Sequence, residues 1–328
     1  MNLADLGERG AVEILKKVYD RGHLIGIGDD CGVIELDDNY ILVTTDVVNQ
    51  RTHIPAGATP VQIGWYLVAI NLSDVAAMGG FPLGFVTALS MPRTTAVDYL
   101  RELARGIEDC CRQFGIPVLG GDTKEASELS LAGTAIGKVK KSKILLRRGA
   151  RAGDVVVVTG EIGRSGLAYR QVTDPVHQRD ALDVILRPYP RVEEGKMLSE
   201  SGVVSSCMDV SDGLGTTLAQ MARASGVHFE ISWAKLPLPH DLRQLPAKEA
   251  KEAALHFGGD YELVATVRPA AVTELQHRLE ASRHKLTVIG TVAEHGSNLL
   301  LTEGGEEPLE DRGWEHFRTE LKSVTQRQ

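Results

Sequence analysis

The spacing of apolar and polar residues divides the chain into helices and short strands. An amphipathic stripe over residues 8–21 and a long, largely apolar run over 60–78 each predict a helix. Apolar runs at 33–36 and 40–44 flank a polar turn at 37–39, which is the pattern of a β-hairpin. The remaining elements of this part are predicted as strands at 83–90, 116–119 and 129–139 and a helix at 94–114.

The second part of the chain begins with an apolar strand at 154–159 and continues as a mixture of helices and strands. Helices are predicted at 163–172, 179–187, 191–201, 211–225 and 270–283. Strands are predicted at 206–210, 227–232, 261–267, 286–292 and 298–302. A basic run at 138–151 separates the two parts, so we predict domains at 1–149 and 150–328.

Composition and charge exclude several classes of function. The chain has 36 basic and 44 acidic residues, a formal net charge of −8, and only 5% aromatic residues. Such a chain is a poor candidate for binding nucleic acid. No apolar run reaches the roughly 18 residues that a membrane-spanning helix needs. The four cysteines, Cys31, Cys110, Cys111 and Cys207, form no C-x-x-C pair, so we expect a cytoplasmic protein.

Apolar strands of this chain end repeatedly in glycine or threonine next to aspartate. The motifs are IGIGDD with Asp29 and Asp30, LVTTD with Asp46, VLGGDT with Asp122, and MDVSDG with Asp209 and Asp212. Asp74 is a further acid inside the apolar run 60–78. Glycine lets the backbone approach phosphate oxygens, whereas carboxylates repel phosphate unless a divalent cation lies between them. Together these motifs predict a magnesium–nucleotide site.

Each motif taken alone has a simpler interpretation. Asp-Gly and Gly-Asp pairs are common in turns, and Ser211 is a residue type that often caps a helix N-terminus. The recurrence of the pattern, with Asp74 on an apolar stripe, favours the metal interpretation. The chain contains no P-loop motif, no G-x-G-x-x-G fingerprint, no H-R-D or D-F-G and no H-E-x-x-H pair.

Taken in order, these motifs resemble one family. They are IGDDCGVI, TTD, NLSDVAAMG, LGGDT, GDVVVVTG, DVSDGL, GGDYEL and a final GW-x-HF, and they cover the chain from about residue 1 to 317. The chain resembles the thiamine-monophosphate kinases, in the superfamily of aminoimidazole ribonucleotide synthetase. The resemblance implies a two-domain α+β, PurM-like fold, with an N-terminal sheet that pairs in a homodimer and a C-terminal α/β domain. It also implies transfer of the γ-phosphoryl group of ATP to thiamine monophosphate.

The resemblance further implies a set of site residues. Magnesium ligands are expected at Asp30, Thr44, Thr45, Asp46, Asp74, Asp122, Asp209 and Asp212. ATP contacts are expected at Arg105, Gly121, Asp122, Arg147 and Ser211. Substrate contacts are expected at His53, Gly259 and Trp314. We assign no catalytic residue beyond the metal ligands, because phosphoryl transfer depends mainly on positioning and charge neutralisation.

The chain departs from the family pattern on the substrate side. Gly259 occupies a position where the family usually has an acid, and the segment 48–54 differs from the usual V-E/A-G-x-H-F. Lys124 and Glu125 follow the GGDT motif, where an arginine is usual. Trp314 offers a flat face for a cationic thiamine ring, but it also suits a simple packing anchor. Three alternatives stay open: a selenophosphate- or purine-type synthetase, a maturation partner like the hydrogenase protein of this superfamily, and a nucleotide-binding module without activity.

Overall fold

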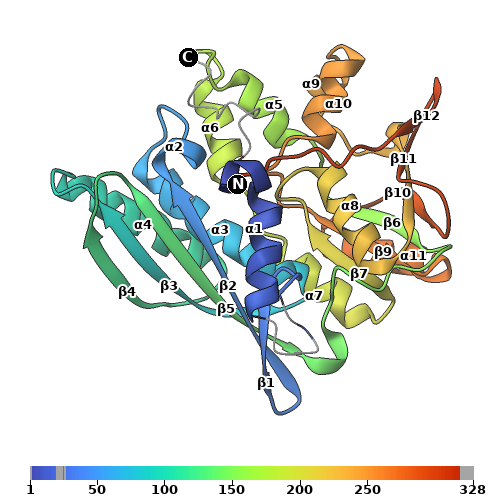
Figure 1. Cartoon of the computed structure of the whole chain (residues 1–328), viewed down its shortest axis with the longest axis horizontal. Helices are drawn as coiled ribbons and strands as arrows, with labels where there is room; N and C mark the ends of the chain where they lie inside the picture. Colours follow the sequence, from blue (N-terminus) through green and yellow to red (C-terminus); the bar gives the residue numbers. More distant parts are fainter. Residues whose placement is uncertain (1, 20–24, 26, 318–328) are drawn as a thin grey trace.

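The computed structural model describes residues 2–19, 25 and 27–317, and it contains two β-sheets lying side by side (Figure 1). A five-stranded sheet has the order β1-β2-β5-β3-β4, and a seven-stranded sheet has the order β12-β11-β8-β10-β6-β9-β7. The first five strands lie in the first part of the chain and the other seven in the second part. The α+β architecture expected from the sequence is therefore confirmed, whereas the boundary at 149/150 stays a prediction.

The elements of the first part agree with the predicted pattern. The helices are α1 (Leu3–Tyr19), α2 (Gln50–His53), α3 (Pro60–Ala77) and α4 (Val97–Gln113). The strands are β1 (Gly32–Leu36), β2 (Asn39–Asn49), β3 (Phe81–Met91), β4 (Val118–Glu125) and β5 (Ser130–Lys140), followed by the short 3-10 helix η1 (Lys141–Lys143). The predicted strand at 116–119 is thus displaced toward its C-terminal side, so that the GGDT motif lies within β4.

The second part contains the larger sheet and its helices. The strands are β6 (Val155–Thr159), β7 (Val204–Asp209), β8 (His228–Ser232), β9 (Leu263–Val267), β10 (Leu286–Ala293), β11 (Leu299–Thr302) and β12 (Gly305–Pro308). The helices are α5 (Arg164–Gln171), α6 (Gln178–Leu186), α7 (Val192–Ser201), α8 (Leu214–Ser225), α9 (His240–Arg243), α10 (Ala247–Leu255) and α11 (Val272–Ala281). The sequence pattern missed α2, α9, α10 and β12. None of the helices that the structure describes is long and apolar enough to cross a membrane.

Helix α3 lies at the junction of the two parts and is buried almost throughout. Thr59 caps it by accepting from the Gln62 backbone while the Gln62 side chain accepts from the Thr59 backbone, and Pro60 occupies the first turn. The helix packs on β2 and β5 on one side and on α7 and β7 of the second part on the other. Its C-terminal end therefore faces the end of β7, where Asp209 lies.

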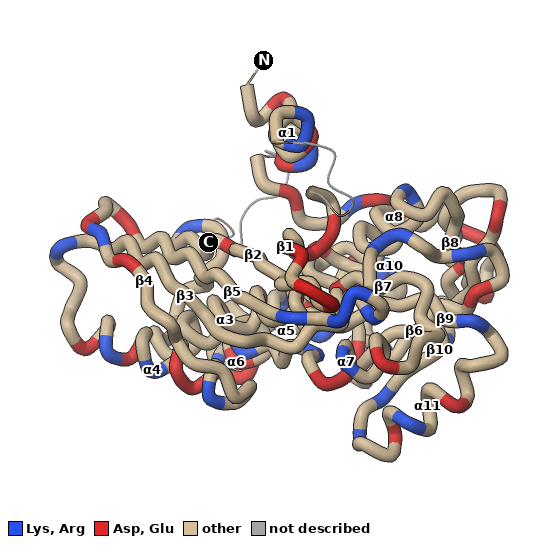
Figure 2. Tube along the Cα trace, turned by 90° about the horizontal axis from the view of Figure 1, so that it is seen from below, with Lys and Arg blue, Asp and Glu red and all other residues tan. Residues whose placement is uncertain are grey.

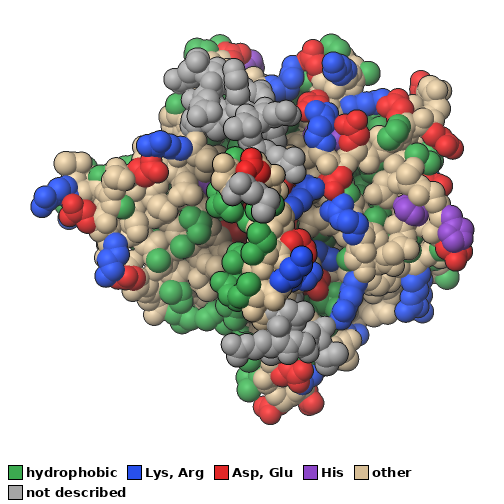
Figure 3. All heavy atoms as spheres, viewed as in Figure 1, with side chains coloured by type: hydrophobic (Ala, Val, Ile, Leu, Met, Phe, Trp, Pro, Cys, Tyr) green, Lys and Arg blue, Asp and Glu red, His purple; other side chains and the backbone are tan. Residues whose placement is uncertain are grey.

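The five-stranded sheet is covered by helices on one face only. Figure 2 shows α3 and α4 on one side of β3, β4 and β5, with no described element packed over the opposite side of β3 and β4. Apolar side chains remain exposed on the strands, including Val47 at 49%, Leu83 at 39% and Leu119 at 56%. In Figure 3, hydrophobic side chains gather over these strands and along α1. Exposed apolar patches of this kind are typical of interaction surfaces.

The predicted helix at 211–225 begins later than expected. Gly213 is its N-cap, with φ of 103°, and the helix starts at Leu214. Ser211 is therefore not the N-cap, and it lies with Asp212 in the short loop that connects β7 to α8. The Gly213 backbone lies against the 255–257 carbonyls, where an added Cβ would come within 3.0 Å of the Leu255 oxygen. The DVSDG motif thus makes a tight loop beside the end of β7.

Candidate functional site

Three aspartates from distant parts of the chain meet where the two parts join. Asp30 precedes β1, Asp74 is in the last turns of α3, and Asp209 ends β7. One carboxylate oxygen from each lies within 4.8 Å of the other two. Asp209 is 1% exposed and Asp30 is 9% exposed. The cluster therefore places three carboxylates in a nearly dry environment.

Hydroxyl and guanidinium groups hold these carboxylates in place. The Thr44 hydroxyl donates to Asp74 Oδ2 at 2.6 Å, and the Ser73 hydroxyl donates to Asp209 Oδ2 at 2.6 Å. Arg147 donates to Asp30 Oδ1 from Nη2 at 2.7 Å and from Nε at 3.3 Å. The other Asp30 oxygen, Oδ2, is buried and has no hydrogen-bond partner among the described residues. One acceptor in the middle of the cluster is thus left for a ligand.

The electrostatics of the cluster fit a divalent cation. Burial, with Asp46 and Asp209 nearby, raises the pKa of Asp74 well above its ordinary value. Burial, together with Asp30, raises the pKa of Asp209 to about 7. Carboxylates this close cannot all ionise at low cost unless a positive charge lies among them. The oxygen-only donor set and the unpartnered oxygen of Asp30 match what Mg²⁺ takes in proteins.

Two further acids lie beside this cluster. Burial and the Glu8 carboxylate raise the pKa of Asp46 to about 6 and that of Asp212 to about 7. Glu8 is in α1, and its side chain accepts a hydrogen bond from the His316 backbone at 3.1 Å. Helix α1 and the C-terminal segment therefore meet over the acids. No sequence motif had singled out Glu8.

The C-terminal GW-x-HF segment reaches the first part of the chain. The rings of His53 and His316 are 5.2 Å apart, and Trp314 packs edge-on against His316 at 5.5 Å. The Trp314 backbone N–H donates to the Asp212 carbonyl oxygen at 3.2 Å. Burial, with His316 adjacent, lowers the pKa of His53 to about 4. The predicted substrate residues His53 and Trp314 are thus gathered next to the acids, with His316 between them.

Several of the predicted residues lie elsewhere. Strand pairing places Asp122, Ala88, Ala132 and Val47 in one row across the sheet, so Asp122 shares the open face with Val47. Asp46 is one residue from Val47 and therefore points to the opposite, helix-covered face. Asp122 is exposed and pairs with Lys124 at 3.3 Å. Within one chain, Asp122 does not reach the cluster.

Of the other predicted residues, some lie at the acid cluster and some lie away from it. Thr45 faces the open side, where its hydroxyl donates to the Gly133 carbonyl at 2.8 Å, while Thr44 faces the cluster. Gly121 is exposed on β4. Arg105 is exposed on α4 and, within the described part of the chain, makes no hydrogen bond or ion pair with the clustered acids.

Gly259 lies next to the loop that carries Ser211. Its backbone N–H donates to the Ser211 carbonyl at 2.8 Å. Its backbone φ of 97° lies in a region that residues other than glycine rarely adopt. An aspartate or glutamate here would be strained in this backbone conformation. The conformation therefore suits the glycine of this chain and not the acid that is usual in the family.

Two family models match the chain. AIR synthase related protein, N-terminal domain, matches residues 28–139, and AIR synthase related protein, C-terminal domain, matches residues 151–300. Together they cover most of the chain, including Asp30, Asp74 and Asp209. The PurM-like fold class expected from the sequence is confirmed by these matches.

Similar solved structures agree with the family models. The structure described as AaThiL complexed with AMPPCP and TMP is 29% identical with a TM-score of 0.83, covering 96% of this chain and 99% of that one. Thiamine-monophosphate kinase from Stenotrophomonas maltophilia is 31% identical with a TM-score of 0.75, covering 91% and 96%. The hydrogenase maturation protein HypE of E. coli, at 22% identity and a TM-score of 0.69 over 84% and 87%, shares the fold alone.

Curated relatives named thiamine-monophosphate kinase match this chain over nearly their whole length. Thiamine-monophosphate kinase of Pyrococcus horikoshii is 34% identical over 308 residues, 93% of this chain and 96% of the relative. The enzyme of Aquifex aeolicus is 32% identical over 327 residues, 97% and 100%. With the clustered acids and the matching fold, these likenesses show that the chain belongs to the thiamine-monophosphate kinase family, within the AIR synthase related proteins.

Proposed function

We propose that this protein transfers the γ-phosphoryl group of ATP directly to the phosphate of thiamine monophosphate, giving ADP and thiamine diphosphate. The observation that carries the proposal is the convergence of Asp30, Asp74 and Asp209 beside Arg147. In the reaction, the bond between the γ-phosphorus and the β–γ bridging oxygen breaks. A bond forms between the γ-phosphorus and an oxygen of the acceptor phosphate.

Magnesium would be held by Asp30, Asp74 and Asp209, with Asp46 and Asp212 beside them, and it would neutralise charge on the nucleotide phosphates. The chain's own residues supply positioning. Thr44 and Ser73 fix the carboxylate rotamers through their 2.6 Å hydrogen bonds. Arg147 presents a planar guanidinium suited to phosphate oxygens. An acceptor phosphate is already ionised at neutral pH, so the reaction requires no strong general base.

A coupled assay of ADP release tests this function. We expect release with ATP, Mg²⁺ and thiamine monophosphate together, and formation of thiamine diphosphate in equal amount. Omission of thiamine monophosphate, or exhaustive chelation of divalent cations, should abolish release. ADP release that does not depend on the acceptor would contradict the proposal, and so would activity that survives chelation.

Trp314 is proposed to contact the thiamine rings. We expect Trp314→Ala to raise KM for thiamine monophosphate about tenfold, because an aromatic–cation contact is worth on the order of 1–2 kcal/mol. KM for ATP should change little, and Trp314→Phe should restore most of the affinity. Steady-state kinetics with each substrate varied in turn measure this. Equal effects on both substrates would instead assign Trp314 to packing, consistent with its contacts to His316 and Asp212.

We also propose that the protein works as a homodimer that pairs through the open face of the five-stranded sheet. This face carries exposed Val47, Leu83 and Leu119. Asp122 lies on the same face, three strands away from the strand that carries Asp46. If Asp122 and Gly121 bind nucleotide and metal as the family pattern implies, they act on the cluster of the partner subunit.

Mixed dimers test this arrangement. Homodimers of Asp122→Asn and of Asp209→Asn should both be nearly inactive. A purified mixed dimer has one site with both aspartates intact if the two act across the interface, and we expect about half of the wild-type activity. If both residues act within one chain, every site in the mixed dimer is defective. An inactive mixed dimer would therefore overturn the proposed arrangement.

A further inference from the structure

A cavity of about 500 Å³ lies beside the residue expected to contact substrate. That residue, Gly259, lines the cavity together with Asp260, Glu262 and Arg191. The cavity therefore belongs to the substrate side of the proposed reaction. Three of the four residues named lie in the segment 259–262, so the position of this segment shapes the wall that thiamine monophosphate would meet.

The segment 259–262 is also joined to the loop that follows Asp209. The Val210 N–H donates to the Glu262 carbonyl at 2.8 Å, and the Tyr261 N–H donates to the Val210 carbonyl at 2.9 Å. Asp209 itself is held separately, because its side chain accepts from the Ser73 hydroxyl at 2.6 Å. Movement of the Glu262 side chain is therefore expected to change the cavity wall more than the acid cluster.

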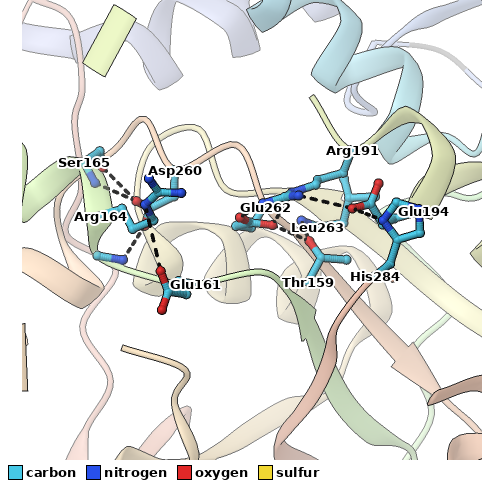
Figure 4. Close-up of polar contacts among 11 residues, drawn as sticks. Thr159, Glu161, Arg164, Ser165, Arg191, Glu194, Asp260, Glu262, Leu263 and His284 are labelled. Atoms are coloured by element: carbon cyan, nitrogen blue, oxygen red, sulfur yellow. Dashed lines mark hydrogen bonds and ion pairs between the residues drawn. The ribbon is translucent and has the colours of Figure 1, made fainter. Parts of the chain in front are cut away.

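Arg191 holds the side chain of Glu262, as Figure 4 shows. Its Nε donates to one Glu262 oxygen at 2.7 Å and its Nη2 donates to the other at 2.5 Å, the paired geometry that suits a guanidinium and a carboxylate. Its remaining nitrogen, Nη1, donates to Glu194 Oε1 at 3.2 Å. Glu194 and Glu262 are each 2% exposed, so two buried carboxylates share one guanidinium.

His284, in the turn between α11 and β10, lies where a second positive charge is needed. Its Nδ1 is 3.0 Å from Glu194 Oε1, and its Nε2 is 3.1 Å from Glu193 Oε2. A neutral imidazole has one N–H, so both contacts are hydrogen bonds only when the ring is protonated. The other oxygen of Glu194, Oε2, is buried and has no hydrogen-bond partner within the described part of the chain.

The charges of this group balance only when His284 contributes. Arg191 brings one positive charge and the two buried glutamates bring two negative charges, which leaves a net charge of −1. A protonated His284 brings the sum to zero. A buried carboxylate without a partner is costly. Without the charge of His284, Glu194 would therefore compete with Glu262 for the guanidinium of Arg191.

We propose that His284 is a positioning residue for the substrate side of the reaction. It compensates the charge of Glu194, so that Arg191 stays on Glu262 and the segment 259–262 stays in place. His284 is not among the residues that line the cavity, so it acts only through its neighbours. This role rests on the proposed kinase function and adds to it a residue that no sequence motif contains.

Steady-state kinetics of His284→Gln test this role, because glutamine keeps a hydrogen-bond donor and removes the charge. We expect KM for thiamine monophosphate to rise about fivefold, a typical size for coupling through a contact network. KM for ATP and kcat should change little, since Ser73 and Arg147 hold the acid cluster independently. His277→Gln, which alters an exposed histidine on α11, is the matched control and should behave as the wild type.

A second substitution separates charge compensation from packing. Glu194→Gln removes one buried negative charge, so Arg191 and Glu262 balance each other without His284. The double variant Glu194→Gln/His284→Gln should therefore return to the KM of the wild type. If His284 served only in packing, the second change would add to the damage instead of repairing it. A double variant as impaired as His284→Gln would overturn the proposal, and so would a His284→Gln protein with wild-type kinetics.

Amide hydrogen exchange without substrates separates this role from the kinase reaction itself. We expect His284→Gln to speed exchange in the segment 259–262, and the double variant to restore the wild-type rate. Protection of β6, in the middle of the larger sheet, should not change, which shows that the variants are folded. If the protein does not phosphorylate thiamine monophosphate but exchange follows this pattern, the kinase proposal fails and the positioning of the segment stands. Equal exchange in all three proteins would overturn the positioning role even in an active kinase.

Discussion

Replacing Asp209 by asparagine is expected to lower kcat at saturating Mg²⁺ by at least about a hundredfold, or about 2.7 kcal/mol of transition-state stabilisation. Asparagine keeps the shape of the side chain and an acceptor for the Ser73 hydroxyl. It removes the charge that would hold a metal ion against polyphosphate. Asp46→Asn should have an effect of similar size, because Asp46 lies close enough to Asp74 in the cluster to raise the pKa of that carboxyl group.

The Asp209→Asn substitution should stabilise the protein when no metal is bound. Burial raises the pKa of Asp209 to about 7 in the folded state, well above its ordinary value of 3.8. When the pKa of a carboxyl group is higher in the folded than in the unfolded state, the free energy of unfolding falls as the pH rises from the unfolded-state pKa to the folded-state pKa. Asparagine has no such penalty, so the thermal midpoint of the metal-free variant should exceed that of the wild type at pH 8. At pH 4 the two midpoints should converge.

Asp37→Asn is the matched control for this prediction. Asp37 is exposed in the hairpin turn between β1 and β2, with φ of 49°. Asparagine adopts this left-handed conformation as readily as aspartate, so activity and stability should stay at the wild-type level. An Asp209→Asn variant as active as Asp37→Asn would show that the clustered acids are not metal ligands.

Replacing Gly106 by alanine is expected to lower the free energy of unfolding by about 3 kcal/mol or more, at the upper end of overpacking effects. Helices α3 and α4 cross in contact at two glycines. A Cβ on Gly106 would lie 2.0 Å from the Val61 carbonyl oxygen, and one on Gly64 would lie 2.2 Å from the Leu103 carbonyl oxygen. Both obstacles are backbone atoms on the faces where α3 and α4 pack together, so the helices themselves must move apart.

Thermal melts of Gly106→Ala and Gly304→Ala measure this effect. Gly304 lies in the exposed turn between β11 and β12, and its added Cβ would have a nearest neighbour at 3.7 Å, an ordinary contact. Its variant should melt close to the wild type. A Gly106→Ala protein that also melts like the wild type would show that α3 and α4 can separate without cost, contrary to the packing described here.

Local sequence signals were sufficient to find most of the elements. The apolar run 60–78 was enough to predict α3, because burial of consecutive residues is a local signal, and the structure adds the cap formed by Thr59 and Gln62. Helix α10 escaped prediction because its sequence, AKEAKEAAL, offers a weak apolar stripe made of alanines. The loop at Ser211 was also misjudged, since a serine before a helix resembles a cap whether or not its side chain makes one.

The sequence by itself determined that acids follow strands beside glycine and threonine, and hence that metal and phosphate chemistry was expected. It could not decide which acids meet. Asp46 and Asp122 occur in equivalent motifs, yet strand pairing turns them to opposite faces of one sheet. Side chains alternate with every residue along a strand, so register alone selects the face. That register, and the approach of α3 to β7 that joins Asp74 to Asp209, arise from long-range packing that no local pattern encodes.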